Sequence, residues 1–359
     1  MAAIATGLAS AGLLFGGYLL RAGRAAAGAT ARPSVGQLFV YPVKGCAGVA
    51  VDSAQLTPYG LAHDREYMIV YRKTADMASN NECDESVWHF LTPRVVPGMI
   101  RLTPRVAADS CELVEMSLDG DVLQLDRETH LAAVDCGDVA AAWLESKLCP
   151  MTRTAMRLRL VHLGASPFES RPEGGRRALE DDSVPWVSWP SGCRELIPSA
   201  IEAGAFADGF PLLVLSSAAI DELNSRLAAA GAPAVSIHNF RPNVVLDGVP
   251  PHAEDYAEML VLPERELELV CVKPCARCSV PTVDPATGVR SPEAQPTKTL
   301  RTYRAAVPGE NDVFFGMNVV HTKSGVRLAR GDEVVLARAA EYRGPAAPAS
   351  CARFATAEH

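Results

Sequence analysis

The chain has 359 residues, of which 48% are hydrophobic and 21% are charged, with ten cysteines and a formal net charge of −8. This length accommodates about two domains, each large enough to bury its own core. The composition excludes a disordered chain, and the acidic balance argues against a general nucleic-acid-binding protein, which needs a basic face. The cysteine content excludes a small disulfide-built scaffold and favours a reducing compartment.

The first segment of the chain is uncharged. From Met1 to Leu20 no side chain is charged, and a helix of about 20 residues spans about 30 Å, the thickness of a bilayer's hydrocarbon core. Arg21, Arg24 and Arg32 follow it, and positive flanks stay on the cytoplasmic side. We expect a retained anchor that leaves the large domain facing the cytosol. A cleaved signal or an organelle transit peptide is the alternative.

Short runs of β-branched and apolar residues begin at residue 34 and alternate with Gly, Pro and Asp, a pattern typical of strands and turns. Asp119 and Gly120 join two of these runs, as expected for a tight hairpin. The predicted strands are residues 37–41, 68–71, 113–118, 122–125, 243–246, 267–272 and 319–320.

Two helices are predicted, over residues 137–148 and 217–230. Ser217 is positioned to cap the second helix, and Gly231 to end it. Both segments carry apolar residues at helical spacing. These residues are Val139, Trp143 and Leu144 in the first helix, and Ile220, Leu223 and Leu227 in the second.

A polar stretch rich in Pro, Gly and Ser lies between His162 and Phe210 and predicts a domain junction or a long surface loop. The end of the chain has a low-complexity Pro/Ala composition and is predicted to be disordered. The expected organisation is an anchor and linker over 1–33, a β-rich domain over 34–165, a linker over 166–195, a second domain over 196–340 and a tail over 341–359.

Three cysteines, Cys271, Cys275 and Cys278, lie within eight residues of one another, beside Lys273 and Arg277. The positive charges favour a thiolate, the form that binds metal or attacks. A structural zinc site is disfavoured because it needs four ligands. A thioredoxin-like pair is disfavoured because it opens a helix, whereas a turn follows this cluster. Buried free cysteines are the commonest alternative. A single thiolate ligand to a soft metal centre is a further one.

The most specific motif is Cys275-Ala276-Arg277-Cys278, followed by residues 281–285. Other motifs occur in order along the chain, at residues 41–46, 60–65, 90–94, 206–211, 239–248, 253–255 and 315–318. Together they resemble the MOSC-domain family over residues 34–336. The resemblance implies an α+β, mainly β fold, with a MOSC β-barrel domain preceded by a β-rich MOSC N-terminal domain. Membrane-anchored members of the family are the mitochondrial amidoxime-reducing components.

The resemblance also implies a molybdenum cofactor (Mo-molybdopterin) whose metal is bound by Cys278 as the catalytic cysteine, and not by Cys275. An acidic protein must gather local cations around this anionic group, and the arginine fork suits phosphate and pterin oxygens. Salt bridges are the alternative role for the cations, and Asn243 alternatively completes a strand end. The cofactor-binding candidates are Lys44, Gly45, Arg65, Asp208, Arg241, Asn243, Ala276, Arg277 and Asn318.

Three features depart from the family pattern. Gly45 stands where the mitochondrial members usually have serine, and Asn318 where some members have tyrosine. Residues 76–87 resemble an insertion, in which Cys83 has no expected role. These departures concern the substrate pocket rather than the cofactor.

The implied activity is that of an oxidoreductase that reduces N-hydroxylated compounds such as amidoximes, hydroxylamines and N-oxides. No nicotinamide- or flavin-binding glycine motif follows a strand, so electrons must come from a partner. The family implies cytochrome b5 and its reductase, and the mitochondrial outer membrane. One alternative is a cofactor carrier or sulfur-transfer module, although the sulfurases carry a pyridoxal-phosphate domain that we do not expect here. The other is an interaction protein with an incidental cysteine cluster.

Overall fold

The computed structural model describes residues 32–73, 88–107, 113–125, 135–152, 156–162, 210–305 and 312–337. The predicted anchor, the insertion, the junction between His162 and Phe210, and the tail lie outside these residues. Within the described stretches, no helix is both long and apolar enough to cross a membrane. The described chain is rich in strands and poor in helices, so the mainly β fold is confirmed.

Eight strands form one sheet, here called the large sheet. Its strands pair antiparallel except for one parallel pair, β11 with β12. In spatial order they are β17 (Val335–Ala337), β13 (Met259–Leu262), β14 (Leu267–Ala276), β15 (Phe314–His321), β11 (Leu212–Ser216), β12 (Val244–Asp247), β1 (Ser34–Val40) and β2 (Val49–Val51).

Strands from the start of the described chain pair with strands from its second half. β1 pairs with β12, so residues 34–38 lie against residues 244–247. β3 (Ser53–Thr57) pairs with β16 (Arg327–Ala329) on one side and with β4 (Gly60–Leu61) on the other. The first strands of the region expected as an N-terminal domain therefore share their hydrogen bonding with the second region.

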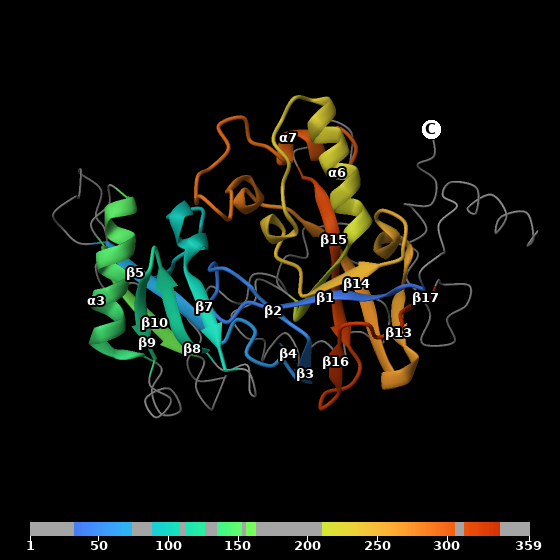
Figure 1. The fold of residues 1–359 in the computed structure, drawn as a ribbon, viewed down its shortest axis with the longest axis horizontal. Coiled ribbons are helices and arrows are strands. Elements are labelled where there is room, and N and C mark those ends of the chain that lie inside the picture. The colour runs from blue at the N-terminus through green and yellow to red at the C-terminus, as the bar shows by residue number, and fades with distance from the viewer. Residues whose placement is uncertain are drawn as a thin grey trace, which may run out of the picture.

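The rest of the N-terminal region forms a separate body, here called the N-terminal body, with two three-stranded sheets. Figure 1 shows it beside the large sheet, with β1 and β2 between the two. Its core includes Ile69, Met99, Leu144 and Leu158. Its sheets are β10 (Met156–His162), β5 (Tyr67–Lys73) and β6 (His89–Phe90), and β7 (Thr103–Val106), β8 (Leu113–Leu118) and β9 (Asp121–Gln124).

Helix α3 (Gly137–Leu148) covers β10 and has the predicted bounds. Its apolar face is rotated from the prediction. Val139 is 76% exposed, whereas Ala140, Leu144 and Leu148 are buried. Because Ala140, Leu144 and Leu148 form the face that packs into the core of the N-terminal body, Val139 faces solvent.

Helix α6 (Ser217–Ala229) covers the large sheet with the three residues predicted for its stripe. Ser217 is not the cap, because the helix already begins there and Ser216 occupies the N-cap position. The Ser216 hydroxyl instead accepts a hydrogen bond from the His252 N–H, at 3.0 Å. Gly231 follows the helix with φ +67°, as predicted for its end.

The predicted strands all exist, and β14 and β15 extend beyond their predicted ends. Asp119 and Gly120 both have positive φ and join β8 to β9 through a two-residue turn. Shorter helices complete the described chain: α7 (Thr297–Leu300), η2 (Pro97–Arg101), η3 (Cys149–Met151), η5 (Ile237–Asn239), η6 (Ala253–Tyr256), η7 (Pro263–Arg265) and η8 (Val280–Thr282).

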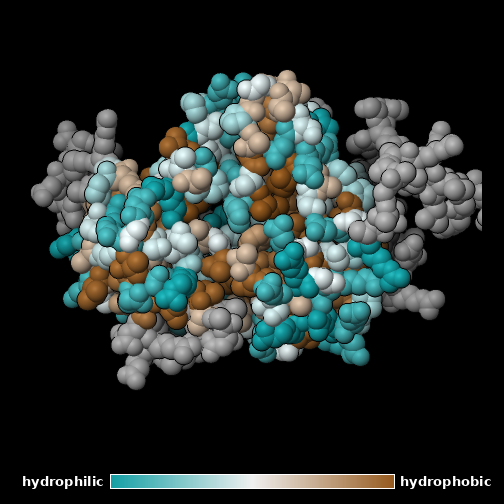
Figure 2. All heavy atoms as spheres, in the orientation of Figure 1, coloured by the Kyte–Doolittle hydropathy of each residue, from teal (hydrophilic) through white to brown (hydrophobic). Residues whose placement is uncertain are grey.

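The chain crosses from the large sheet to the N-terminal body directly after β1. Val40 packs in the core of the large sheet, whereas Val43 and Cys46 pack in the core of the N-terminal body. On the face drawn in Figure 2, hydrophobic residues gather in the middle of the molecule, with hydrophilic residues over much of the rest. Tyr41 lies between Val40 and Val43 in the chain, and it is therefore at the junction of the two bodies.

Candidate functional site

Tyr41 is the hub of this junction. It is 1% exposed, and its hydroxyl donates to the Pro242 carbonyl at 3.1 Å. The guanidinium carbons of Arg65 and Arg241 lie 4.6 Å and 4.3 Å from the centre of its ring, within the range of cation–π attraction. Burial raises the pKa of the Tyr41 phenol well above its usual range, so the hydroxyl stays protonated.

Arg65 is held by a buried ion pair with Asp64. Its guanidinium also donates to Asn243 Oδ1 at 3.1 Å and to the Arg241 carbonyl at 3.4 Å. The other Asp64 oxygen accepts from the Tyr41 N–H at 2.8 Å. Arg65 therefore has the structural ion pair that was the alternative to cofactor binding, and cofactor contact stays a prediction.

Arg241 is half-buried and donates to the backbone carbonyl of Cys46, which ties the large sheet to the N-terminal body. Within the described part of the chain it forms no ion pair. Burial lowers the pKa of its guanidinium, although an arginine keeps its charge in proteins. An anion beside it would offset the cost of burying that charge.

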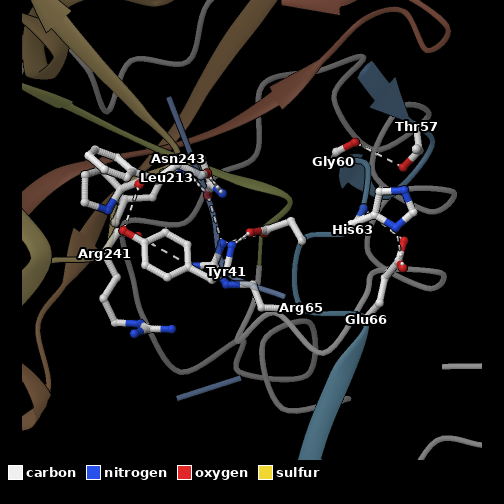
Figure 3. A network of polar contacts seen from close by, with 12 residues as sticks. Tyr41, Thr57, Gly60, His63, Arg65, Glu66, Leu213, Arg241 and Asn243 are labelled. Atoms are coloured by element: carbon white, nitrogen blue, oxygen red, sulfur yellow. Dashed lines mark hydrogen bonds and ion pairs between the residues drawn. The ribbon is translucent and has the colours of Figure 1, made fainter. Parts of the chain in front are cut away.

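Three residues of the junction have left-handed backbones without being glycine. His63, Arg65 and Arg241 have φ of 64°, 53° and 59°. Such a conformation is costly for a residue with a Cβ and is concentrated at functional sites. Figure 3 shows Arg65 and Arg241 beside Tyr41, with His63 and Glu66 to one side.

Asn243 lies at the strand end before β12 and is 1% exposed. Its Oδ1 accepts from Arg65 and from the Leu213 N–H, and its Nδ2 donates to the Phe39 carbonyl at 3.2 Å. The side chain thus joins β11, β12 and β1. This is the strand-end role left open by the sequence, and cofactor contact by Asn243 stays a prediction.

Asn318 lies at the same level of the large sheet as Asn243. It is opposite Leu213 on β11 and opposite Lys273 on β14, and the backbone of Leu213 bonds to that of Asn243. With strands about 4.8 Å apart, the two asparagines stand two strands, or about 10 Å, from each other. Asn318 is half-buried, which leaves part of it accessible.

Arg277 brings the cysteine motif to the same junction. It donates to the Phe240 carbonyl at 2.6 Å and to Cys275 Sγ at 3.0 Å. Its Nε is buried, with no hydrogen-bond partner among the described residues. Its positive charge, like those of Arg65 and Arg241, acts on the Tyr41 phenol. Two arginines therefore stack on Tyr41, Arg277 acts on it through its charge, and Asp64 is the carboxylate among them.

Cys278 is exposed and follows β14, and its Sγ accepts from the Val280 N–H at 3.5 Å. Helix η8 comes next and is anchored by Asn239, whose Nδ2 donates to the carbonyls of Pro281 and Val283 at 3.0 and 3.2 Å. Two motifs that are far apart in the sequence are thus bonded directly. The thiol accordingly stands on a fixed loop and is accessible.

Cys46 and Cys271 differ from Cys278, because both are buried. Burial raises the pKa of the Cys46 thiol to about 12, which keeps it neutral and unsuited to bind metal. Cys271 is also buried.

Lys44 is half-buried, with its ammonium 4.8 Å from the centre of the Phe90 ring. Gly45 follows with φ +83°.

The structure therefore brings most of the predicted site residues to one junction. Ala276 is exposed at the end of β14, and Asp208 lies outside the described residues. Among those residues there is no group of three His, Cys, Asp or Glu placed to hold a metal ion. The sequence analysis missed Tyr41, Asp64 and Asn239 as site residues, although each lies within a motif that it identified.

Comparison with known proteins agrees with this architecture. Residues 32–150 match the MOSC N-terminal beta barrel domain, and residues 202–335 match the MOSC domain. The chain is 29% identical to mitochondrial amidoxime-reducing component 1 of Homo sapiens, over 84% of this chain and 82% of that protein. It is 29% identical to mitochondrial amidoxime reducing component 2 of Bos taurus, over 78% and 75%.

A relative from Danio rerio, mitochondrial amidoxime-reducing component 1, is 27% identical over 81% of each chain. The similarity thus extends over both matched domains and over the cysteine motif. With its two domain matches in the order predicted from the motifs, the chain belongs to the MOSC-domain family.

Proposed function

We propose that this protein binds a molybdenum cofactor at the junction, with Cys278 as the ligand of the metal. The observation that carries the proposal is an accessible cysteine on a fixed loop, next in the chain to Arg277, whose positive charge acts on Tyr41 together with those of Arg65 and Arg241. A thiolate suits a soft metal centre, and guanidinium groups suit phosphate and pterin oxygens.

The residues present fit such a group. Among the described residues, the Nε of Arg277 has no hydrogen-bond partner and half-buried Arg241 forms no ion pair. Buried cations are costly unless they are paired, and an anionic cofactor would pair them. Lys44, Arg65, Arg241 and Arg277 would neutralise the cofactor, while Asp208, Ala276 and Asn318 would make further contacts.

We also propose that the activity is the reduction of N-hydroxylated compounds, as the names of the relatives suggest. The bound cofactor would supply the two-electron chemistry at the N–O bond. The chain itself would supply the thiolate, the orientation and the positive field. Electrons would come from cytochrome b5 and its reductase, and residues 1–20 would hold the protein on the mitochondrial outer membrane.

Replacing Cys278 tests both the ligand and the function. In a cofactor-producing host, we expect Cys278→Ser to lose most of its molybdenum and to reduce benzamidoxime about 100-fold or more slowly. Elemental analysis and turnover with cytochrome b5 and its reductase measure the two effects. Because Cys278 is exposed, the thermal midpoint should barely change.

Cys275→Ser is the matched control, since it removes a thiol from the same loop. We expect it to keep its molybdenum and most of its activity. A Cys278→Ser protein with the molybdenum content of the parent would contradict the ligand assignment. Molybdenum without turnover in the parent would identify a cofactor carrier instead.

A further inference from the structure

Arg290 joins the cysteine loop to the N-terminal body. Its Nη1 donates to the Ser279 carbonyl at 3.2 Å and to Thr282 Oγ1 at 3.4 Å. Its Nη2 donates to the carbonyls of Pro93 and Arg94 at 2.9 and 3.4 Å. One guanidinium thus bonds two segments that are nearly 200 residues apart in the chain.

Both ends of this bridge touch the proposed cofactor site. Ser279 directly follows Cys278. At the other end, a Cβ built on Gly45 would stand only 3.2 Å from Pro93 Cδ, so Pro93 packs against the Lys44–Gly45 loop. A continuous series of contacts therefore leads from Gly45 through Pro93 and Arg290 to the residue after Cys278.

The turn that presents Arg290 is itself pressed against the N-terminal body. Asp284 closes the turn, with its carbonyl accepting from the Gly288 N–H at 2.8 Å. Gly288 has φ +70°, and a Cβ there would lie 2.8 Å from the Gly98 Cα in η2. Arg290 is then fixed by its pairing with Val283 across the loop.

All four acceptors of Arg290 are uncharged, and the described residues give it no ion pair. The interaction thus depends on the forked geometry of the guanidinium, which a lysine ammonium cannot reproduce. The second bridge between the two bodies, from Arg241 to the Cys46 carbonyl, is also made by an arginine.

We infer that Arg290 is a positioning residue, which holds the Cys278 loop at a fixed separation from the Lys44–Gly45 loop. The effect of Arg290 on metal binding rests on the proposed function, whereas its effect on the Cys278 loop does not. Arg290→Lys and Arg290→Gln test it, and Arg327→Lys is the control. Arg327 also bonds across distant segments, to Ser53 Oγ at 2.9 Å, but between β16 and β3.

Hydrogen exchange in the full chain without cofactor reports on the loop. We expect the amides of Thr282, Val283, Val95 and Val96, which bond within the two turns that Arg290 joins, to exchange about tenfold faster in both Arg290 variants. The two segments lose the guanidinium hydrogen bonds that hold these turns in place. Arg327→Lys should exchange like the parent at these amides. Parental exchange in Arg290→Lys and Arg290→Gln would overturn the inference.

Molybdenum retention then reports on the site. In protein from a cofactor-producing host, we expect Arg290→Lys to lose molybdenum on dialysis about tenfold faster than the parent. Faster exchange with parental retention would overturn the link to the metal. A parent without molybdenum would contradict the proposed function, and the exchange rates would still decide whether Arg290 positions the loop.

Discussion

Gly45 shows how a single position is constrained from two sides. Its φ of +83° favours glycine, and a Cβ there would lie 2.9 Å from Met99 Cε. Met99 belongs to the core of the N-terminal body. The serine expected here from the family resemblance would therefore require the backbone to change or Met99 to move. The departure at Gly45 is accordingly matched to its surroundings in this chain.

Gly45→Ala and Gly120→Ala separate these two constraints. Gly120 has a similar φ of +87°, but a Cβ there would meet nothing within 4 Å. We expect Gly120→Ala to lower the free energy of unfolding by about 1 kcal/mol, and Gly45→Ala to lower it by about 3 kcal/mol because the methyl group also overpacks. Denaturant titrations measure both, and equal losses would mean that Met99 accommodates the methyl group.

Arg241 is the residue whose replacement best tests the positive field. We expect Arg241→Ala to lower the molybdenum content severalfold, because it removes a half-buried cation and the bond to the Cys46 carbonyl. Arg241→Lys, which keeps the charge, should retain more metal. Elemental analysis of purified protein decides the matter, and equal molybdenum in all three proteins would contradict the role of the cation.

At the scale of the element, helix η6 carries a buried carboxyl group behind β11. Glu254 is fully buried, and its Oε1 accepts from the Ser216 N–H at 3.1 Å. Burial, together with the negative charge of Asp255, raises the pKa of Glu254 to about 7. Burial lowers the pKa of the neighbouring His252 to about 4.

The raised pKa predicts how stability depends on pH. Between about pH 4.5 and 7 the folded state binds more protons at Glu254 than the unfolded state. The stabilisation that protonated Glu254 contributes is therefore lost as the pH rises through 7. Glu254→Gln removes this pH dependence. From pH 5 to pH 8, the parent should lose about 2–3 kcal/mol of unfolding free energy relative to the variant. Denaturant titrations at the two values check this, and parallel pH profiles would refute it.

Local signals predicted several elements well. Apolar residues at helical spacing over residues 137–148 predict α3, and the Asp119-Gly120 turn predicts the β8–β9 hairpin. The details that were wrong depend on packing. Val139 points to solvent because the face of α3 that packs into the core carries Ala140, Leu144 and Leu148 instead. The hydroxyl of Ser216 bonds to the His252 N–H rather than to its own helix, and no local pattern indicates such a partner.

Across the whole molecule, motif order predicted which segments form the site, but not how they meet. Tyr41, Arg65 and Arg241 come from three separate motifs, and their stacking arises only where β1 leaves the large sheet. Arg290 lies in no motif. Its acceptors are mostly backbone carbonyls, which carry no sequence signal, so the sequence did not indicate its contacts. Sequence reasoning therefore finds the residues of a site more easily than the contacts that fix them.

The predicted anchor belongs to this scale as well. We expect a protein lacking residues 1–31 to leave the membrane fraction, because it loses the uncharged segment from Met1 to Leu20. Its amidoxime reduction should stay within about twofold of the full chain, since every residue proposed to hold the cofactor lies beyond residue 31 in the sequence. Fractionation and turnover measure the two, and a truncated chain still found with membranes would contradict the anchor.

The place of β1 in the large sheet has a consequence for biosynthesis. β1 is translated early, yet its partner β12 follows it by about 200 residues. At roughly 5–20 residues per second, a ribosome takes on the order of 10–40 s to deliver that partner. During this interval β1 can pair only with β2, its other neighbour in the large sheet, so the edge that faces β12 must be shielded until the second half of the chain emerges.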